Sequence, residues 1–195
     1  MISMTYGHLI IFGGVCIASC FLAAYLLPRL LLLVYKGAIL KQGFGGGPIP
    51  VNTLYAESKE LLRDPMHLPA GASKLATRGV NRDTLYVAGW LELAKGPLVL
   101  HVPDFSDRYY SVQFTDPSKN INFAYVGTRA TGTKAGDYLI TGPGWKGVVP
   151  QGMTRISSPG NSVMVFGRVL VYDDGELATA YDLAKQVRLA PLDNK

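Results

Sequence analysis

An uninterrupted apolar run near the N-terminus limits what this chain can fold into. No charged residue occurs from Leu9 to Leu27, and apolar residues resume after Arg29. A helix of about 20 apolar residues crosses the hydrocarbon core of a bilayer. The run therefore predicts one membrane-spanning helix over about residues 8–34, in contact with membrane lipid, within an N-terminal anchor of residues 1–41.

A cleaved signal peptide is the alternative interpretation of this segment. Signal peptides begin with basic residues, contain an apolar core of roughly 7 to 15 residues and end at a cleavage site with small residues. Here no Lys or Arg precedes the run, the run is longer, and the stretch Tyr25–Pro28 offers no small-residue site. We therefore expect the helix to be retained as a single-pass anchor.

The basic residues that follow the run bear on which side of the membrane the domain occupies. Arg29, Lys36 and Lys41 are the only charged residues before Glu57. By the positive-inside rule they favour a cytoplasmic domain. They also account for three of the net +5 charges, so the rest of the chain is nearly balanced. A nucleic-acid surface needs clustered basic residues, and we therefore expect no nucleic-acid partner.

Few residues that carry common chemistries occur outside the run. Both cysteines, Cys16 and Cys20, lie within it, which excludes a disulfide, a thiolate nucleophile and a cysteine metal site from the domain. The histidines His8, His67 and His101 stand apart, so no metal site is expected. The sequence also lacks a G-x-S-x-G nucleophile elbow, and it assigns no catalytic residue.

A glycine pattern typical of dinucleotide-binding sites is present but lacks its context. Gly142, Gly144 and Gly147 satisfy G-x-G-x-x-G directly after a predicted strand. In dinucleotide-binding proteins a helix follows, and its N-terminus receives the pyrophosphate. Here residues 148–152 contain Pro and Gly instead of a helical pattern. We therefore expect a rigid turn with Trp145 packed over it, and no cofactor.

The sequence beyond the anchor predicts a linker and one β-rich globular domain. Glycine and proline residues predict a linker over residues 42–50, and residues 51–195 form the domain. Thr53 is expected to cap a short helix that continues to Leu62. From Val80 on, short runs of β-branched and aromatic residues alternate with turn residues, as in antiparallel sheets. The predicted strands are Leu85–Leu93, Leu98–Val102, Tyr109–Thr115, Asn122–Val126, Tyr138–Thr141, Thr154–Ser157 and Val163–Tyr172.

This number of short strands sets the predicted fold class. About seven strands are typical of an antiparallel β-sandwich or a jelly-roll-like domain. After them Asp174 is a predicted helix cap, and apolar residues recur at helical spacing from Leu177 to Val187, before Pro191. The fold class is therefore mainly β, with a C-terminal helix that covers one face or edge of the sheet.

Several charged residues lie in strand-like, apolar surroundings and form the candidate site. Because buried charges must be paired, an internal ion-pair network is one interpretation. A pocket whose arginines bind an anionic ligand is the other. Asp104 and Asp107 also flank a turn, where two carboxylates bind calcium, act as acid and base, or cap the turn. The candidate residues are Asn81, Asp83, Tyr86, Asp104, Arg108, Tyr110, Arg129 and Arg168.

A series of short motifs follows in order along the domain. They are Asn81–Tyr86, Gly89–Leu93, Pro97–Asp104, Asp107–Gln113, Gly127–Gly132, Gly142–Gly147 and Gly167–Arg168. Over about residues 51–192 this order resembles the domain-of-unknown-function family 1254, which occurs in bacteria and some large viruses. The resemblance implies a β-rich fold and carries no settled activity. The motif residues themselves predict turns with positive φ at Gly127, Gly142 and Gly144.

The resemblance also implies a setting for the domain. Many longer members of that family carry a second, companion domain after this one, and this sequence ends where the companion would begin. The resemblance therefore implies a separately encoded companion as a partner protein. Bacterial members often carry export signals, which favours a periplasmic domain on a bacterial inner-membrane anchor, against the positive-inside rule.

Two functions from different classes remain. The first is a membrane-anchored accessory or assembly subunit that binds partner proteins and has no catalysis of its own. Small residues let transmembrane helices approach closely, and Gly13, Gly14, Ala18 and Ser19 either form such a contact or merely face lipid. The second is an envelope enzyme or small-ligand-binding domain that acts on a sugar or an anionic metabolite. Its pocket would use Asp83, Asp104, Arg108, Tyr110 and Arg129.

Overall fold

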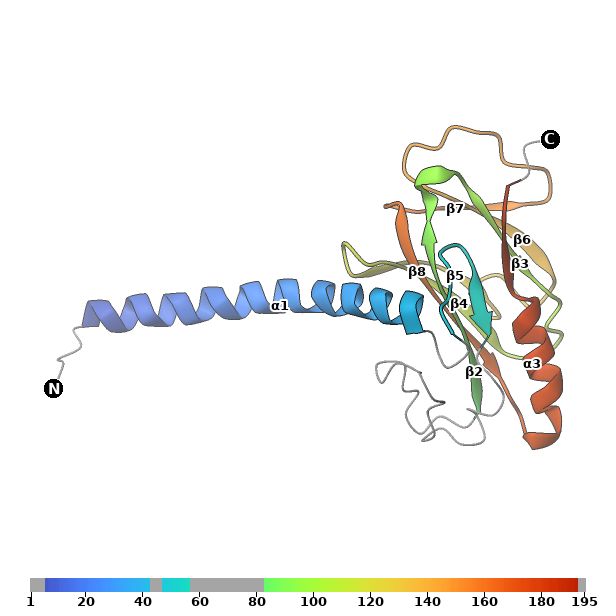
Figure 1. Cartoon of the computed structure of the whole chain (residues 1–195), viewed down its shortest axis with the longest axis horizontal. Coiled ribbons are helices and arrows are strands. Elements are labelled where there is room, and N and C mark those ends of the chain that lie inside the picture. The colour runs from blue at the N-terminus through green and yellow to red at the C-terminus, as the bar shows by residue number, and fades with distance from the viewer. Residues whose placement is uncertain (1–5, 43–46, 57–82, 193–195) are drawn as a thin grey trace.

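The computed structural model describes residues 6–42, 47–56 and 83–192. A long N-terminal helix leads into a two-sheet β-sandwich, and a second helix precedes its last short strand (Figure 1). The helices are α1 (Tyr6–Gln42) and α3 (Leu177–Gln186), with short 3₁₀ helices η2 (Leu93–Lys95) and η3 (Asp174–Glu176). The strands are β1 (Leu54–Ala56), β2 (Thr84–Glu92), β3 (Leu98–Val102), β4 (Tyr110–Asp116), β5 (Ile121–Gly127), β6 (Gly136–Thr141), β7 (Thr154–Ser157), β8 (Ser162–Leu170) and β9 (Arg188–Pro191).

The strands form two sheets. The five-stranded sheet has the order β1-β2-β8-β4-β5, and the four-stranded sheet has the order β7-β6-β3-β9. All of these pairs are antiparallel except β6 with β7. Strand β8 is the centre of the larger sheet, since it pairs with β2 on one side and with β4 on the other. The mainly β sandwich predicted from the sequence is confirmed.

Alternating side chains from the two sheets build the core. On β8, Val163, Val165 and Val169 point inward and are at most 2% exposed, whereas Phe166 and Arg168 lie at the alternate, outward positions. This alternation follows from strand geometry, in which successive side chains point to opposite faces. It explains why the seven predicted strands are confirmed to within two residues at each end.

The C-terminal helix covers one edge of the sandwich. Leu177, Ala180 and Ala184 of α3 are buried, and the helix lies against β1, β2 and β8. Asp174, the predicted cap, instead begins the 3₁₀ helix η3, which Asp173 caps, and α3 follows it with Glu176 at its N-cap and no side-chain cap bond. The Asp173 side chain accepts a hydrogen bond of 3.1 Å from the backbone N–H of Glu176, at the end of η3.

Two short strands differ from the sequence predictions. Strand β1 occupies Leu54–Ala56, where a helix starting at Thr53 was predicted, because this segment pairs with β2. Strand β9 occupies Arg188–Pro191, where the helical pattern was predicted to continue, because the segment pairs with β3. The rest of the predicted short helix, residues 57–62, lies outside the described residues. In both cases a pairing partner distant in the sequence decides the local conformation.

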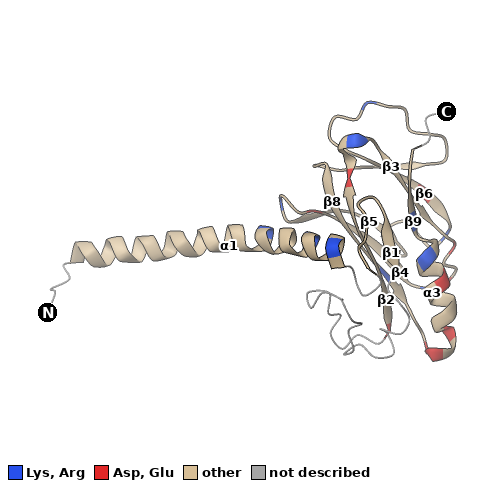
Figure 2. Cartoon of the chain, in the orientation of Figure 1, with Lys and Arg blue, Asp and Glu red and all other residues tan. Residues whose placement is uncertain are grey.

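Helix α1 is long and apolar enough to cross a membrane. It continues past the predicted span to Gln42, and its charged residues occur only in the turns nearest the sandwich (Figure 2). Those last turns lie on the outer face of the five-stranded sheet, where Ile39 packs with Ile49 and Ala88 in a small cluster, each residue at most 3% exposed. The helix projects from this side of the sandwich, with the four-stranded sheet on the far side (Figure 1).

Replacing Gly89 with Ala should destabilise the sandwich. A Cβ at this position would lie 2.2 Å from the carbonyl oxygen of Thr53 and 2.8 Å from the Leu54 side chain, so β1 would have to move off β2. Overpacking of this kind costs about 1–3 kcal/mol. For a chain of this size each kcal/mol lowers the melting temperature by roughly 2–4 °C.

Thermal unfolding of the full chain in detergent, followed by circular dichroism, measures this effect. The matched control is Gly136→Ala, whose Cβ would meet only the Tyr138 ring, at an ordinary contact distance of 3.4 Å. Equal melting temperatures for the two variants would contradict the close approach of β1 to Gly89.

Candidate functional site

The outer face of the five-stranded sheet, beside α1, carries two adjoining hollows. A groove of about 570 Å³ runs between the helix and the sheet. A second cavity of about 350 Å³ adjoins it and shares one residue with it, Arg168. The groove is lined by Pro28, Leu31, Leu32, Val34 and Tyr35 of α1, and by Gln113, Met164, Phe166 and Arg168 of the sheet. The cavity is lined by Tyr109, Tyr110, Ser111, Tyr125, Val126, Gly127, Arg129, Ala130 and Arg168.

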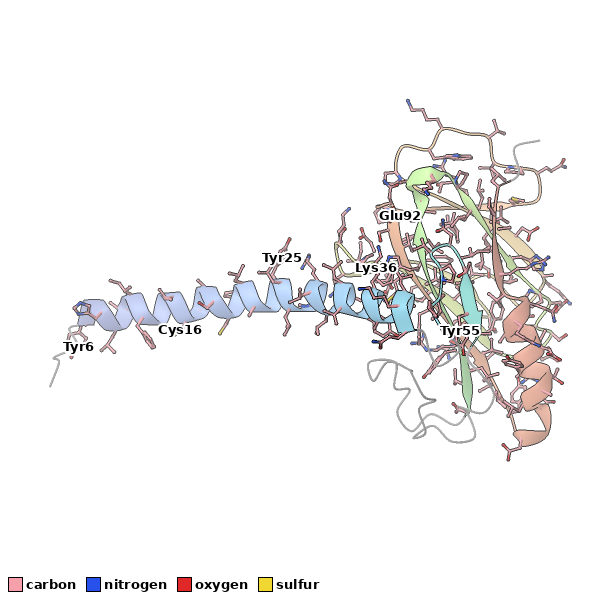
Figure 3. All side chains as sticks on the ribbon, viewed as in Figure 1. Tyr6, Cys16, Tyr25, Lys36, Tyr55 and Glu92 are labelled. Atoms are coloured by element: carbon pink, nitrogen blue, oxygen red, sulfur yellow. The ribbon has the colours of Figure 1, made fainter. Side chains whose placement is uncertain are left out.

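Two basic residues fasten α1 to this face. Arg29 donates from Nε to the carbonyl oxygen of Ser118 in the β4–β5 turn at 2.8 Å, and its guanidinium lies 3.7 Å from the centre of the Tyr25 ring. Lys36 donates to Ser162 Oγ at 3.3 Å and lies over the Trp90 ring at 5.2 Å (Figure 3). The indole N–H of Trp90 donates to the same Ser162 oxygen at 2.7 Å. These contacts hold the helix at a defined place on the sheet.

Asp116 shapes the turn that receives Arg29, and sequence reasoning did not single it out. Its carboxylate is 1% exposed, and its Oδ1 accepts hydrogen bonds from the N–H and the hydroxyl of Ser118 at 2.8 and 2.6 Å. These bonds orient Ser118 so that its carbonyl oxygen is available to Arg29. A carboxylate at the end of a strand, two residues before a serine, is a common turn signal in a sequence. The contact of this turn with Arg29 of the anchor, however, can be seen only in the folded structure.

Arg108 supports the fold. Its side chain is buried, donates to the carbonyl oxygen of Leu170 at 2.8 Å and forms an ion pair with Glu176 at the start of α3. The guanidinium also lies 5.0 Å from the centre of the Tyr172 ring. Arg108 therefore ties the end of strand β8 to the start of the C-terminal helix, and its ion-pair partner Glu176 lies outside the group of residues predicted from the sequence.

Tyr110 also belongs to the core. Its ring is fully buried and stacks on Phe105 with ring centres 3.9 Å apart, and its hydroxyl donates to the carbonyl oxygen of Gly132 at 3.2 Å. Burial raises the pKa of this phenol, which keeps it protonated as a hydrogen-bond donor. It packs the sandwich, and only the edge of the residue reaches the cavity.

Asp104 caps an exposed turn. Its Oδ1 accepts the N–H of Ser106 at 2.7 Å, and its Oδ2 forms an ion pair with Lys134 at 3.1 Å. The hydrogen bond from Ser106 and then the Lys134 ammonium hold the pKa of the Asp104 carboxyl below its usual range. Within the described part of the chain, no three His, Cys, Asp or Glu residues come together as metal ligands would. The turn-capping interpretation of Asp104 therefore fits the geometry.

The remaining arginines of the candidate cluster meet at the cavity. Arg168 lies over Phe166 at 4.8 Å, and Arg129 lies over Tyr109 at 5.5 Å. Among the described residues, neither guanidinium has a carboxylate within ion-pair distance. Tyr86 packs on the same Phe166 ring, with centres 4.9 Å apart.

Other predicted residues lie away from this cavity. Asp83 accepts a hydrogen bond of 2.9 Å from the Thr84 hydroxyl at the start of β2, and Asn81 lies outside the described residues. Along α1, Gly14, Ala18 and Ser19 are exposed and Gly13 is partly exposed. The predicted cluster therefore divides into fold-supporting residues and the pair Arg129 and Arg168.

The glycine pattern Gly142–Gly147 includes a turn at Pro143 and Gly144. No helix follows Gly147 over residues 148–153, and the Trp145 ring packs against Gly147, as predicted. Gly127 and Gly144 have φ of 152° and 74°, which confirms the predicted positive φ. Gly142 does not, and the prediction was wrong there. A Cβ at Gly142 would lie 2.7 Å from Asn161 Oδ1, so a larger residue there would displace the Asn161 side chain.

One polar pair was missed because the histidine and its partner are far apart in the sequence. His101 on β3 lies opposite Asp137 on β6, and His101 Nδ1 is 2.7 Å from Asp137 Oδ1. Such a pair orients an imidazole for general-base work. In the described part of the chain, however, no hydroxyl or thiol hydrogen-bonds to His101. The pair lies on the outer face of the four-stranded sheet, away from the cavity.

Comparisons with known proteins give a family and a fold. A family model described as a protein of unknown function, DUF1254, matches residues 64–191. No curated protein sequence matches the chain. The crystal structure of the VPA0106 protein from Vibrio parahaemolyticus is similar, with 29% identity and a TM-score of 0.54, over 57% of this chain and 28% of that chain.

A second solved structure is less similar. An uncharacterized protein from Burkholderia cenocepacia matches with 13% identity and a TM-score of 0.41, over 62% of this chain and 31% of that chain. The present chain therefore spans less than a third of the length of either structure that it resembles.

Two arginine substitutions should separate the fold-supporting residues from the cavity. Arg108→Gln removes the ion pair with Glu176 and should lower the free energy of unfolding by about 2 kcal/mol, as expected for a hydrogen bond to a charged group. Arg129→Gln makes the same chemical change at an exposed residue and should stay within about 0.5 kcal/mol of the wild type. Denaturant unfolding of the full chain in detergent compares them. An Arg129 variant as unstable as the Arg108 variant would refute this division.

The turn at Asp104 should give a measurable pH dependence. Because its folded pKa is lowered, its contribution to stability is present above the unfolded pKa and is lost as the pH falls through the lower, folded pKa. Asp104→Asn should therefore be less stable than the wild type at neutral pH, and the gap should close in acid. Melting temperatures of both proteins across this pH range provide the measurement, and a gap that does not change with pH would contradict the assignment.

Proposed function

The chain belongs to the DUF1254 family of proteins of unknown function, and we propose that it acts as a membrane-anchored accessory subunit that binds partner proteins. In this proposal the protein contributes binding and positioning to a membrane-associated complex and has no catalytic role of its own. The membrane is a bacterial inner membrane, and the β-sandwich lies on its periplasmic side.

The docking of α1 onto the sandwich is the observation that carries this proposal. Arg29, Lys36 and Ile39 each contact the domain, so the anchor and the sandwich form one unit. A domain on a free linker can reach substrates in many orientations, whereas this one presents fixed surfaces at a fixed height above the bilayer. A domain that is held in one orientation relative to its anchor suits a role in assembly.

The use of the polar residues gives further support. Arg108 and Tyr110 are buried, and Asp104 caps a turn. Residues engaged in this way are not free to bind a substrate or to exchange protons with it. Five residues were considered above for an enzyme pocket. Of these, only Arg129 both lines the cavity of about 350 Å³ and carries a charge with no ion-pair partner among the described residues.

Open strand edges offer places for a partner. Strand β5 ends the larger sheet, and strands β7 and β9 end the smaller one. Edge strands can pair with a strand from another chain. In the Vibrio protein the matched region is 28% of the chain, so there the equivalent fold is accompanied by much further polypeptide. We propose that a separately encoded companion domain occupies the corresponding place beside this sandwich.

The contacts of the basic residues also bear on the proposed side of the membrane. Arg29 binds the Ser118 carbonyl and Lys36 binds Ser162, so both have a structural use at the docking contact. Their presence is therefore explained without retention on the cytoplasmic side by the positive-inside rule. This leaves the export signals common in the family as the argument for the periplasm.

A second candidate function is the binding of a small anionic ligand, such as an acidic sugar or metabolite. One observation favours it: Arg129 and Arg168 line one cavity without an ion-pair partner among the described residues. Arginine is suited to carboxylates and phosphates because its planar group donates paired hydrogen bonds.

Purification of the tagged full chain from its native membrane in mild detergent tests the accessory role. Native mass spectrometry should find a stoichiometric complex with another protein. Gly14→Ile should reduce the yield of that complex several-fold. A large side chain on the helix face formed by Gly13, Gly14, Ala18 and Ser19 would prevent close contact with another helix. A clean monomer from native membranes would count strongly against the proposal.

Cys16→Ile is the matched control for the helix contact. It places the same isoleucine side chain two residues away, on the opposite side of α1, because each residue turns the helix by about 100°. It should leave the complex intact. Equal yields from the Gly14 and Cys16 variants would mean that the small residues face lipid and that the sandwich alone binds the partner.

A further inference from the structure

We propose that the groove between α1 and the five-stranded sheet binds one anionic membrane phospholipid. An acyl chain lies along the apolar walls of the groove, and the lipid phosphate binds Arg168 with a contribution from Arg129. A bound lipid of this kind seals the sandwich against the membrane from which α1 emerges. The proposal does not require the partner protein proposed above, although Tyr125 and Val126 of edge strand β5 line the cavity.

The walls of the groove are apolar although they lie beyond the first basic residue of α1. Leu31 and Val34 line the helix side and are 56% and 49% exposed, while Met164 and Phe166 of β8 form the opposite side. The groove volume of about 570 Å³ is that of a site for a single small molecule or lipid chain. Apolar surface open to water is unfavourable, and an apolar ligand relieves that cost.

The position of the groove along α1 matches the depth of lipid headgroups. About 20 residues starting at Leu9 cross the hydrocarbon core, which places the core boundary near Pro28. At about 1.5 Å per residue, the helix from Pro28 to Tyr35 extends roughly 10 Å farther, through the headgroup layer. A phospholipid in the adjoining leaflet can therefore enter the groove sideways without leaving the membrane.

Two arginines lie where the phosphate of such a lipid would be. Arg168 lines both the groove and the neighbouring cavity, and Arg129 lies in that cavity. Since no carboxylate among the described residues pairs with either, their charges are available to an anion. Tyr109 and Tyr125 line the same cavity. Tyrosines of this kind are typical of the interface between membrane and water, and guanidinium groups bind phosphate oxygens through paired hydrogen bonds.

The apolar groove and the two arginines together favour an amphiphilic ligand. A free anion would neutralise the arginines but leave the apolar groove open to water. A neutral lipid would fill the groove but leave two guanidinium groups that have no ion-pair partner among the described residues. An anionic phospholipid satisfies both parts at once, and it is already present at this depth of the membrane.

Native mass spectrometry of the purified full chain, delipidated in detergent and supplied with defined lipids, tests the proposal. The wild type should retain one phosphatidylglycerol in preference to phosphatidylcholine. Arg168→Gln should weaken the retention of phosphatidylglycerol about tenfold, the size expected for one lost charge-assisted contact. Met164→Trp should also reduce it, because the larger side chain fills the groove while both arginines remain.

Arg188→Gln is the matched control, since it removes the same charge from exposed strand β9 of the other sheet. Its retention of phosphatidylglycerol should equal that of the wild type. Equal retention of the two lipids by the wild type, or equal losses in the Arg168 and Arg188 variants, would overturn the proposal. Complete displacement of the lipid by inorganic phosphate would overturn it too, because the site would then be one for a free anion.

The folding of each variant is checked by its circular dichroism melting curve. If Arg168→Gln fails to fold, Arg129→Gln carries the same comparison, with a several-fold loss of phosphatidylglycerol expected. A folded Arg129 variant with unchanged lipid preference would then reject the phosphate site.

Discussion

The contact between the last turns of α1 and the outer face of the five-stranded sheet supports the rest of this structure. Trp90 points away from the core of the sandwich, yet it is fully buried, with Lys36 of α1 over its ring and Ser162 accepting its indole N–H. Ile39 fills the neighbouring space against Ala88. Without the helix, this face would expose a tryptophan and an apolar patch to water, at a cost proportional to the uncovered area. The anchor is therefore also part of the folded domain.

That contact fixes where the functional surface lies. The sheet face that α1 covers in part is the one turned toward the anchor, and its uncovered remainder holds the groove and the cavity with Arg129 and Arg168. Arg29 adds a second point of attachment at the β4–β5 turn, which Asp116 holds in shape. The contact between α1 and the sheet thus sets both the orientation of the domain and the character of its membrane-facing surface.

The arginines illustrate how far the candidate site could be predicted. The sequence placed Arg108, Arg129 and Arg168 in one polar group because each lies in an apolar, strand-like context. Folding separates them, since Arg108 binds Glu176 at the start of α3, whereas Arg129 and Arg168 line a cavity on the outer face of the five-stranded sheet. Residue type and local pattern are the same in the three cases. Only the tertiary fold, which places the loop residues Arg108 and Arg129 as well as Arg168 of β8, determines which of them has a carboxylate within reach.

The sequence by itself determined the apolar anchor, the seven main strands, the C-terminal helix and the family, because these rest on local period, turn residues and motif order. The tertiary structure decided strands β1 and β9, the continuation of α1 onto the sheet, the pairing of His101 with Asp137 and the groove beside Arg168. Each of these depends on a partner many residues away. Local propensity is too weak to fix such segments, and the free energy of pairing and burial across the fold decides them.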